Sequence, residues 1–340
     1  MQVQSFLNEK KTNMKALILR FSSIGDIVLT TPVIRALKTQ LHCEVHYATK
    51  AKFSEILVGN PYIDKVHCLN GSLNDLIAEL KKERYDYVVD LHNSLRTLLI
   101  KSRLGVKSRS FNKLNFRKWL LVNFKINRMP NVHVVDRYMD AVKELGVKTD
   151  SMGLDYFIPS KDEVDMEWLP EAHRNGYVAF VIGATYATKR LPLKRMIQLC
   201  HQINRPIVLL GGKGEFELGE EICRFFEGYD KDEEMKAPPI FNACGKFNLN
   251  QSASLVKQAK YVFTHDTGLM HIAAAFKKEI FSIWGNTVPA FGMYPYRTKF
   301  TIFENNNLSC RPCSKLGYDK CPKGHFKCMN DQKFDFYLPE

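Results

Sequence analysis

Four polar loops in this sequence carry side chains that could do chemistry, and each follows a short apolar run. The loops are Ser22 to Asp26, Gly183 to Lys189, Gly211 to Glu217 and Asp266 to His271. A short apolar run bounded by polar residues indicates a buried strand. Ligands of open α/β sheets bind beyond the carboxyl ends of such strands, so these loops are the first candidates for a site.

The loop at Asp266 combines a strand end with a helix start. Lys260 to Phe263 predicts the strand, and Leu269 to Ala275 predicts the body of the helix. Asp266 stands where a helix N-cap belongs, with Thr267 and Gly268 in the first turn. A helix start presents free backbone N–H groups, and Gly268 lets an anion such as a diphosphate come close to them. An ordinary capped helix would produce the same pattern.

None of these loops has the fingerprint of a dehydrogenase or of a P-loop NTPase. The glycine-rich loop Gly211-Gly212-Lys213-Gly214 has the wrong spacing both for G-x-G-x-x-G and for G-x-x-x-x-G-K-[ST]. Both enzyme classes are therefore disfavoured.

The elements that must position these loops alternate between strands and helices, which predicts parallel βαβ units in an α/β fold. The predicted strands are 15–19, 43–47, 65–68, 87–91, 177–182, 206–210, 260–263 and 281–284. The predicted helices are 27–40, 53–58, 73–82, 132–145, 192–203, 216–226, 250–259 and 269–275, and residues 92–96 are predicted to form a loop.

A break in this rhythm after residue 150 predicts two domains. Gly153, Pro159, Pro170 and Gly176 interrupt the pattern, and the alternation then restarts. We predict a disordered extension, an N-terminal Rossmann-like domain, a linker, a C-terminal Rossmann-like domain and a Cys-rich tail. Their ranges are 1–13, 14–155, 156–175, 176–305 and 306–340.

The composition is that of a globular protein with an excess of positive charge. The chain is 45% hydrophobic and 25% charged, with a net charge of +13. It has no membrane-spanning apolar stretch and no secretory signal, so we expect a cytoplasmic protein with reduced thiols. Much of the excess charge lies among aromatic residues at Lys101, Arg103, Lys107, Arg109, Phe111, Lys113, Phe116, Arg117, Lys118 and Trp119.

This basic region favours an acidic partner. No known nucleic-acid-binding motif accompanies it, so we expect no nucleic-acid partner. An anionic membrane or an anionic acceptor is the preferred interpretation. A basic face that is merely solvated is the alternative.

Five segments resemble the signatures of the lipopolysaccharide heptosyltransferases, glycosyltransferase family 9. They are Ser22-Ser23-Ile24-Gly25-Asp26 with Thr31-Pro32, Asp90 to Arg96, Thr188 to Pro192, Gly211-Gly212 with Glu215 and Glu217, and Asp266 to Ala275. The last segment resembles D-[ST]-G-x-x-H-x-A-A-A, and the five run in the family's order. The resemblance implies the GT-B architecture, in which two Rossmann-like domains face each other across a cleft.

The activity that this resemblance implies is inverting transfer of heptose from ADP-heptose, or a similar nucleotide sugar, to the inner core of lipopolysaccharide. No metal cofactor is required for catalysis in that family. The implied acceptor is an anionic lipid A/Kdo-type molecule. The implied location is cytoplasmic, with peripheral contact at the anionic inner face of the inner membrane.

The resemblance also assigns residue roles. Asp26 would be the catalytic base, although it could instead only cap the following helix. The predicted acceptor-binding residues are Ser23, Gly25, Asn93 and Arg96. The predicted donor-binding residues are Thr185, Thr188, Lys189, Glu215, Glu217, Asp266, Thr267, Gly268 and His271.

Several donor-binding residues have simpler explanations. Lys189 could be a solvated loop lysine. Glu215 or Glu217 would accept from ribose hydroxyls or serve only as an acid at a helix start. For His271, a hydrogen-bonded structural histidine is the favoured interpretation.

The tail carries four clustered cysteines, Cys310, Cys313, Cys321 and Cys328, in the pattern C-x2-C-x7-C-x6-C. Such a cluster raises a structural zinc hypothesis, with His325 as an alternative ligand. Free thiols or a disulfide are the alternatives.

Two other functions stay open from the sequence. One is a related transferase with another donor or acceptor. The other is a non-catalytic protein that binds anionic glycans or nucleic acid.

Overall fold

The computed structural model describes residues 14–227 and 237–339, so the predicted extension at 1–13 lies outside the described residues. The chain forms two compact units. The first contains the described residues up to Lys113 together with Val135–Ser151, and the second contains Leu114–Val134 and the described residues from Met152 onward. The sequence division places 114–134 in the N-terminal domain, whereas the structure groups this segment with the second unit.

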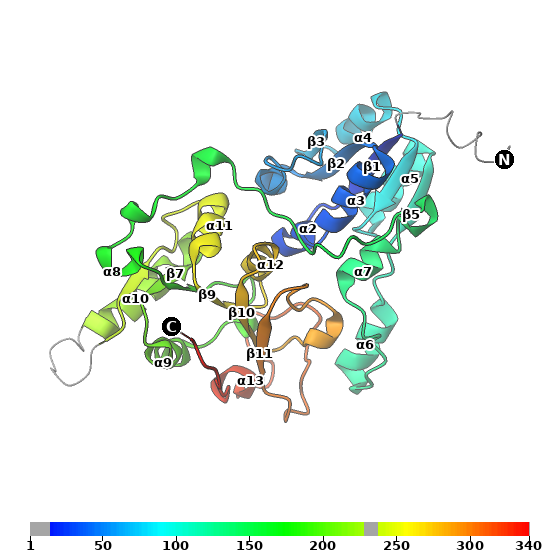
Figure 1. Cartoon of the computed structure of the whole chain (residues 1–340). Coiled ribbons are helices and arrows are strands. Elements are labelled where there is room, and N and C mark those ends of the chain that lie inside the picture. Colours follow the sequence, from blue (N-terminus) through cyan, green and yellow to red (C-terminus); the bar gives the residue numbers. More distant parts are fainter. Residues whose placement is uncertain (1–13, 228–236, 340) are drawn as a thin grey trace. The chain divides into compact units, whose positions relative to one another are not determined.

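The first unit is built on a parallel sheet in the order β3-β2-β1-β4-β5. Its strands are β1 (Lys15–Leu19), β2 (Glu44–Lys50), β3 (Lys65–Leu69), β4 (Tyr87–Asp90) and β5 (Lys107–Ser110). Its helices are α2 (Ile24–Val28), α3 (Thr31–Leu41), α4 (Leu73–Lys82), α5 (Leu95–Leu104) and α7 (Val134–Met139), as Figure 1 shows. This strand order is that of a Rossmann-type sheet.

The sequence of each strand suits its place in this sheet. In the central strand β1, Ala16, Leu17, Ile18 and Leu19 are fully buried. A continuous apolar run is typical of a parallel strand that is covered on both faces. The edge strand β5 alternates exposed and half-buried polar residues instead.

The second unit repeats the same order and adds one strand. Its parallel sheet runs β11-β10-β9-β6-β7-β8. The strands are β6 (Val178–Val181), β7 (Ile207–Leu210), β8 (Ile240–Asn242), β9 (Tyr261–His265), β10 (Glu279–Trp284) and β11 (Phe300–Glu304). The helices are α6 (Asn115–Phe124), α8 (Glu171–Arg174), α9 (Leu193–Ile203), α10 (Phe216–Glu227), α11 (Leu249–Gln258), α12 (Gly268–Ala275) and α13 (Lys327–Asn330).

The structure confirms the eight predicted strands and departs from several other predictions. The strands β5, β8 and β11 and the helices α5 and α6 were not expected, and α5 begins inside the predicted loop at 92–96. The predicted helix at 53–58 is a 3-10 turn at Ala51–Ile56. The predicted helix at 132–145 is only α7, followed by a 3-10 turn at Lys143–Leu145. No helix within the described ranges is long and apolar enough to cross a bilayer.

Each sheet has a point where its winding reverses. In the first unit this point lies between β1 and β4, and in the second it lies between β6 and β9. Crevices for ligands form at such switch points, beyond the carboxyl ends of the strands. The predicted site loops follow these four strands and the neighbouring strand β7.

Candidate functional site

Lys189 and Asp266 lie together at the switch point of the second unit. Lys189 Nζ is 2.6 Å from Asp266 Oδ2 and 3.3 Å from the Asp266 carbonyl oxygen. The two side chains are 17% and 11% exposed, so a ligand at the sheet edge can reach the pair. Lys189 is therefore fixed beside the start of α12 and is not a freely solvated loop lysine.

The start of α12 corrects one prediction. Thr267 is the N-cap and the helix begins at Gly268, so the assignment of Asp266 as N-cap is wrong. The Asp266 carboxylate accepts from Lys189 and from Thr287 Oγ1, at 3.0 Å, and is not directed at the helix N–H groups. Those N–H groups are consequently left for an anion. His271 is buried in this helix.

Glu215 joins the loops that follow β6 and β7. Its Oε2 accepts from the Gly212 N–H at 2.9 Å, and its Oε1 lies 3.4 Å from Arg190 Nη1. A Cβ on Gly211 would lie 2.8 Å from the Glu215 Cβ, and a Cβ on Gly183 would lie 3.1 Å from its carboxyl group. Glycine at 211 therefore leaves room for this acidic side chain, and a Cβ at 183 would crowd its carboxyl group.

The other predicted donor-binding residues differ in accessibility. Glu217 and Thr185 are exposed. Thr188 is buried, and the tail occupies its hydroxyl, which donates to the Tyr318 carbonyl at 3.0 Å and accepts from the Tyr318 N–H at 2.8 Å. Thr188 thus anchors the loop that presents Lys189.

Two residues that the sequence analysis missed hold the same loops. His265 is fully buried at the end of β9 and accepts at Nε2 from the Leu191 N–H at 3.0 Å. Burial, followed by the nearby Arg190, lowers the pKa of His265 to about 3, so its ring is neutral. Arg311 is buried in the tail and donates to the carbonyls of Gly285 and Thr287, at 2.6 and 2.9 Å.

Their sequence signals were weak. His265 directly precedes the Asp266 motif, which could have drawn attention to it. Arg311 lies between two cysteines and has no local pattern of its own.

In the first unit, Asp26 pairs with a buried arginine. Arg20 Nη2 lies 2.6 Å from Asp26 Oδ1, and Arg20 Nη1 also donates to the Leu91 carbonyl at 2.6 Å. The other oxygen, Asp26 Oδ2, accepts from the backbone N–H and the hydroxyl of Ser23, at 3.1 and 2.9 Å. The carboxylate is about one-fifth exposed, and the adjacent guanidinium favours its charged form.

The loop after β4 is organised by Asp90, which is fully buried. One Asp90 oxygen accepts from the N–H groups of His92 and Asn93, at 3.0 and 2.7 Å. The other oxygen lies 2.8 Å from Lys101 Nζ. Asn93 has a positive φ of 48° and donates to the Phe111 carbonyl at 3.0 Å.

Arg96 lies in the first turn of α5. It was predicted to lie in the loop, but Ser94 ends the loop and caps the helix. The Arg96 guanidinium stacks 5.5 Å from the centre of the Phe21 ring. The His92 ring packs edge to face with the same Phe21 ring. Burial, followed by the nearby charge of Arg20, lowers the pKa of His92 to about 4.

The four tail cysteines are neighbours without forming a ready-made tetrahedral set. Burial and the nearby thiols of Cys310 and Cys321 raise the pKa of Cys313. Cys310 Sγ lies 3.8 Å from His325 Nε2. Among the described residues, however, no three ligand atoms of the tail lie within 4.8 Å of one another. The structural zinc site in the tail stays a prediction, which metal analysis of the purified protein would test.

Comparisons with known proteins identify the family and the fold of the chain. The family model described as "Glycosyltransferase family 9 (heptosyltransferase)" matches residues 73–321. The chain is 24% identical to lipopolysaccharide heptosyltransferase 1 of Campylobacter coli, over 81% of this chain and 84% of that protein.

Two solved structures from E. coli share the fold. ADP-heptose LPS heptosyltransferase II superposes with a TM-score of 0.66 at 20% identity, covering 94% of this chain and 98% of that one. The heptosyltransferase WaaC with ADP-2-deoxy-2-fluoro heptose superposes with a TM-score of 0.61 at 20% identity, covering 85% and 93%. The predicted GT-B class is confirmed. Since the family model spans most of its length, the chain belongs to glycosyltransferase family 9, the heptosyltransferases, and is a glycosyltransferase.

Proposed function

We propose that this enzyme transfers heptose from ADP-heptose to the inner core of lipopolysaccharide and inverts the anomeric centre. The observation that carries the proposal is the Lys189–Asp266 pair beside the start of α12. Departing ADP develops negative charge, which preorganised donors must meet. An ammonium group and the free N–H groups of a helix start are suitable donors for a diphosphate.

The choice of ADP-heptose as the donor rests on similar proteins. Two solved structures of similar fold are described as an ADP-heptose transferase and as a complex with an ADP-heptose analogue. Glu215 is the better placed of the two acids for the ribose hydroxyls, because the strand-end loops hold it while Glu217 is exposed.

We assign Asp26 as the base that takes the proton of the acceptor hydroxyl. Inversion requires that hydroxyl to attack the anomeric carbon from the face opposite ADP. Arg20 and Ser23 hold the Asp26 carboxylate in one orientation and leave it partly exposed. The acceptor is a lipid A/Kdo-type molecule, and Arg96 is a cation that could meet its carboxylate or phosphate groups.

Transfer proceeds without a catalytic metal in this proposal, because Lys189 and the helix start supply positive charge to the diphosphate. Turnover should therefore be the same in the presence and absence of a strong chelator. A loss of turnover that added Mg²⁺ restores would contradict this part of the proposal.

The lipid-linked acceptor calls for contact with a membrane, and α6 provides a suitable surface. Phe116, Trp119 and Phe124 are 70%, 44% and 58% exposed and their rings contact one another in series. Arg117 is also exposed on this helix. We propose that this surface binds the anionic inner face of the inner membrane, because aromatic and basic residues together favour anionic bilayers. Flotation should show binding to anionic vesicles and not to neutral ones, and Trp119→Ala should weaken it.

The activity itself is tested by a donor screen with an isolated Kdo-lipid A acceptor, read by mass spectrometry. ADP-heptose should add one heptose to the acceptor. ADP-glucose and UDP- and GDP-linked sugars should add nothing at comparable concentration. Transfer from another sugar nucleotide in preference to ADP-heptose would replace the donor assignment.

A further inference from the structure

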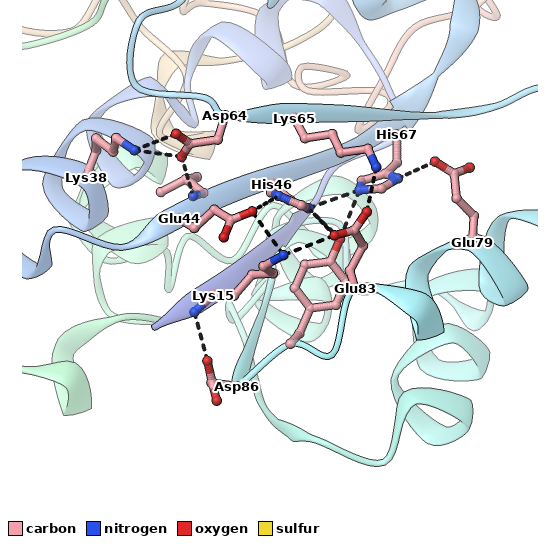
Figure 2. A network of polar contacts seen from close by, with 12 residues as sticks. Lys15, Lys38, Glu44, His46, Asp64, Lys65, His67, Glu79, Glu83 and Asp86 are labelled. Atoms are coloured by element: carbon pink, nitrogen blue, oxygen red, sulfur yellow. Dashed lines mark hydrogen bonds and ion pairs between the residues drawn. The ribbon is translucent and has the colours of Figure 1, made fainter. Parts of the chain in front are cut away.

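A buried cluster of histidine and carboxylate side chains lies away from the transfer site in the first unit. Figure 2 shows His46 on β2, His67 on β3 and Glu83 after α4 converging on one point. Among the residues that the structure describes, this is the one group of three His, Cys, Asp or Glu whose ligand atoms all lie within 4.8 Å of one another. His46 and His67 are 1% and 0% exposed.

The sheet register brings the two histidines together. In the β2–β3 pairing, His46 lies opposite Lys65, and Ala48 lies opposite His67. Since residues two apart on a strand share a face, His46 and His67 lie on the same face of the sheet. Their partners Lys15, Glu44 and Lys65 are the first residues of β1, β2 and β3. The cluster therefore lies towards the amino ends of the strands, whereas Asp26 follows the carboxyl end of β1.

Outer hydrogen bonds fix the proton on each ring. His46 Nε2 lies 2.8 Å from Glu44 Oε1, and His67 Nδ1 lies 2.5 Å from Glu79 Oε1. An ionised carboxylate can only accept, so each of these outer ring nitrogens carries the N–H. The inner nitrogens, His46 Nδ1 and His67 Nε2, consequently present lone pairs to each other at 3.1 Å.

One hydroxyl cannot satisfy both lone pairs. Tyr85 OH lies 2.9 Å from His46 Nδ1 and 3.0 Å from His67 Nε2. It has a single proton and can donate to only one of them. A metal ion between the two nitrogens would satisfy both lone pairs.

The spacing suits a metal ion. Zinc binds histidine nitrogen at about 2.0–2.1 Å with tetrahedral geometry, so two such nitrogens lie about 3.3 Å apart. The observed separation of the inner nitrogens is 3.1 Å, and Glu83 Oε2 lies 3.9 Å from His46 Nδ1. Histidine ligands of metals commonly donate their other N–H to a carboxylate, as Glu44 and Glu79 accept here.

The surrounding charges also admit a cation. Glu83 is held by Lys65 and Lys15, at 2.5 and 3.1 Å, so its carboxylate already has two ammonium partners. Lys15 also lies 3.0 Å from Glu44. With Glu79 included, the cluster has one more carboxylate than ammonium groups. The two lysines compete with a metal for Glu83 and set an upper limit on its affinity.

We propose that His46 Nδ1, His67 Nε2 and Glu83 bind a divalent transition metal ion, zinc in preference, which ties β2 and β3 to the end of α4. Nitrogen and carboxylate ligands in a tetrahedral arrangement favour zinc. Because the ion lies away from the site loops, its role is structural. It should stabilise the first unit without taking part in transfer.

The test uses the full-length chain after treatment with a chelator. Zn²⁺ should raise its melting temperature. Co²⁺ should give the visible d–d absorption of a tetrahedral site that lacks the thiolate-to-cobalt charge-transfer band. That band would mark the tail cysteines, so the spectrum separates the two candidate sites.

Variants locate the ion. His67→Gln should abolish the non-thiolate cobalt spectrum and the zinc-dependent rise in melting temperature. Glu79→Gln changes a half-exposed side chain, keeps the fold, and should weaken zinc binding by about 10–100-fold. The exposed His42→Asn is the matched control and should bind as the parent does.

Two results would overturn the proposal. One is a parent protein that shows only the thiolate-cobalt spectrum or no metal binding. The other is a Glu79→Gln variant and a His67→Gln variant that both bind zinc with the affinity of the parent.

Discussion

Asp26 makes two kinds of contact that bear differently on its role as a base. Asp26 accepts from the backbone N–H of the N-cap residue Ser23, as the acid of a capping box does, which would explain the residue without any chemistry. The ion pair with buried Arg20 does more than a cap requires. It fixes the carboxylate in one orientation and in its charged form, and a base needs both.

Asp26→Asn separates these roles. Asparagine still accepts from Ser23, but it cannot take a proton and leaves Arg20 without its charged partner. We expect turnover to fall by roughly 10²-fold or more, the usual worth of a positioned base. We also expect an unfolding free energy lower by about 1–3 kcal/mol, because a buried charge loses a hydrogen bond. Transfer rates at saturating substrates, beside denaturant melts, measure both.

The matched control for this experiment is Ser23→Ala, which removes one hydrogen bond to the carboxylate and keeps the charge. It should slow transfer by less than roughly 10-fold. If both variants slow transfer equally and slightly, Asp26 is a cap and the base lies elsewhere.

Lys189→Ala tests the diphosphate site. The lysine lies beside the start of α12, and its loss removes a charge-assisted contact worth about 1.5–3 kcal/mol, or roughly 10–100-fold in the Kd of ADP. Lys194→Ala removes the same charge from an exposed position on α9 and controls for net charge. Calorimetric titration with ADP should show a large effect for the first variant and a small one for the second. Equal Kd values for the two variants would place the phosphates elsewhere.

At the scale of elements, the tail supports the donor loops. Tyr318 pairs with Thr188, and Arg311 binds the carbonyls of Gly285 and Thr287. The Thr287 hydroxyl in turn donates to Asp266, the partner of Lys189. A continuous set of contacts therefore runs from the tail to the diphosphate site.

Arg311→Ala should break this support. It removes the charged partner of Glu304 and the donor to two carbonyls, so we expect a loss of about 3–5 kcal/mol in unfolding free energy and weaker ADP binding. Arg205→Ala is the control, because Arg205 also holds the tail, at the Leu338 carbonyl, but away from these loops. Denaturant melts and ADP calorimetry should separate the two variants. Normal ADP affinity in a folded Arg311→Ala protein would show that the tail does not support the site.

Most elements with buried apolar runs were predictable from the sequence, but β5, β8 and β11 were not. The buried apolar runs of β1 and β9 indicate strands by their composition alone. In contrast, β5 has the polar sequence Lys-Ser-Arg-Ser and forms a strand by pairing with β4. In the candidate site, the sequence placed Lys189, Asp266 and Asp26 at strand ends. It did not show their partners. Thr287 is distant in the chain from Asp266, and the local pattern does not mark Arg20, close before Asp26, as its buried partner.

At the scale of the whole molecule, each unit repeats one strand order and places its candidate residues at its own switch point. The units differ in composition, however. All three tryptophans, Trp119, Trp168 and Trp284, lie in the second unit. Only Trp284 is buried, so tryptophan fluorescence reports on the core of that unit.

This asymmetry makes the acid stability of the second unit measurable by itself. His265 is neutral when folded, with a pKa of about 3, while an unfolded histidine titrates near 6.5. Between these values the unfolded chain binds more protons, so the unfolding free energy falls as pH decreases from about 6.5 towards 3.

We expect a loss on the order of a few kcal/mol between pH 7 and pH 4 from denaturant unfolding followed by tryptophan fluorescence. His265→Gln keeps an acceptor for the Leu191 N–H but cannot take up a proton, so part of this acid sensitivity should disappear. His201→Gln, at an exposed position on α9 of the same unit, should leave the sensitivity unchanged. If the pH dependence of His265→Gln matches that of the parent, another group controls the acid response of the second unit, and His173, whose pKa burial also lowers, is the next to test.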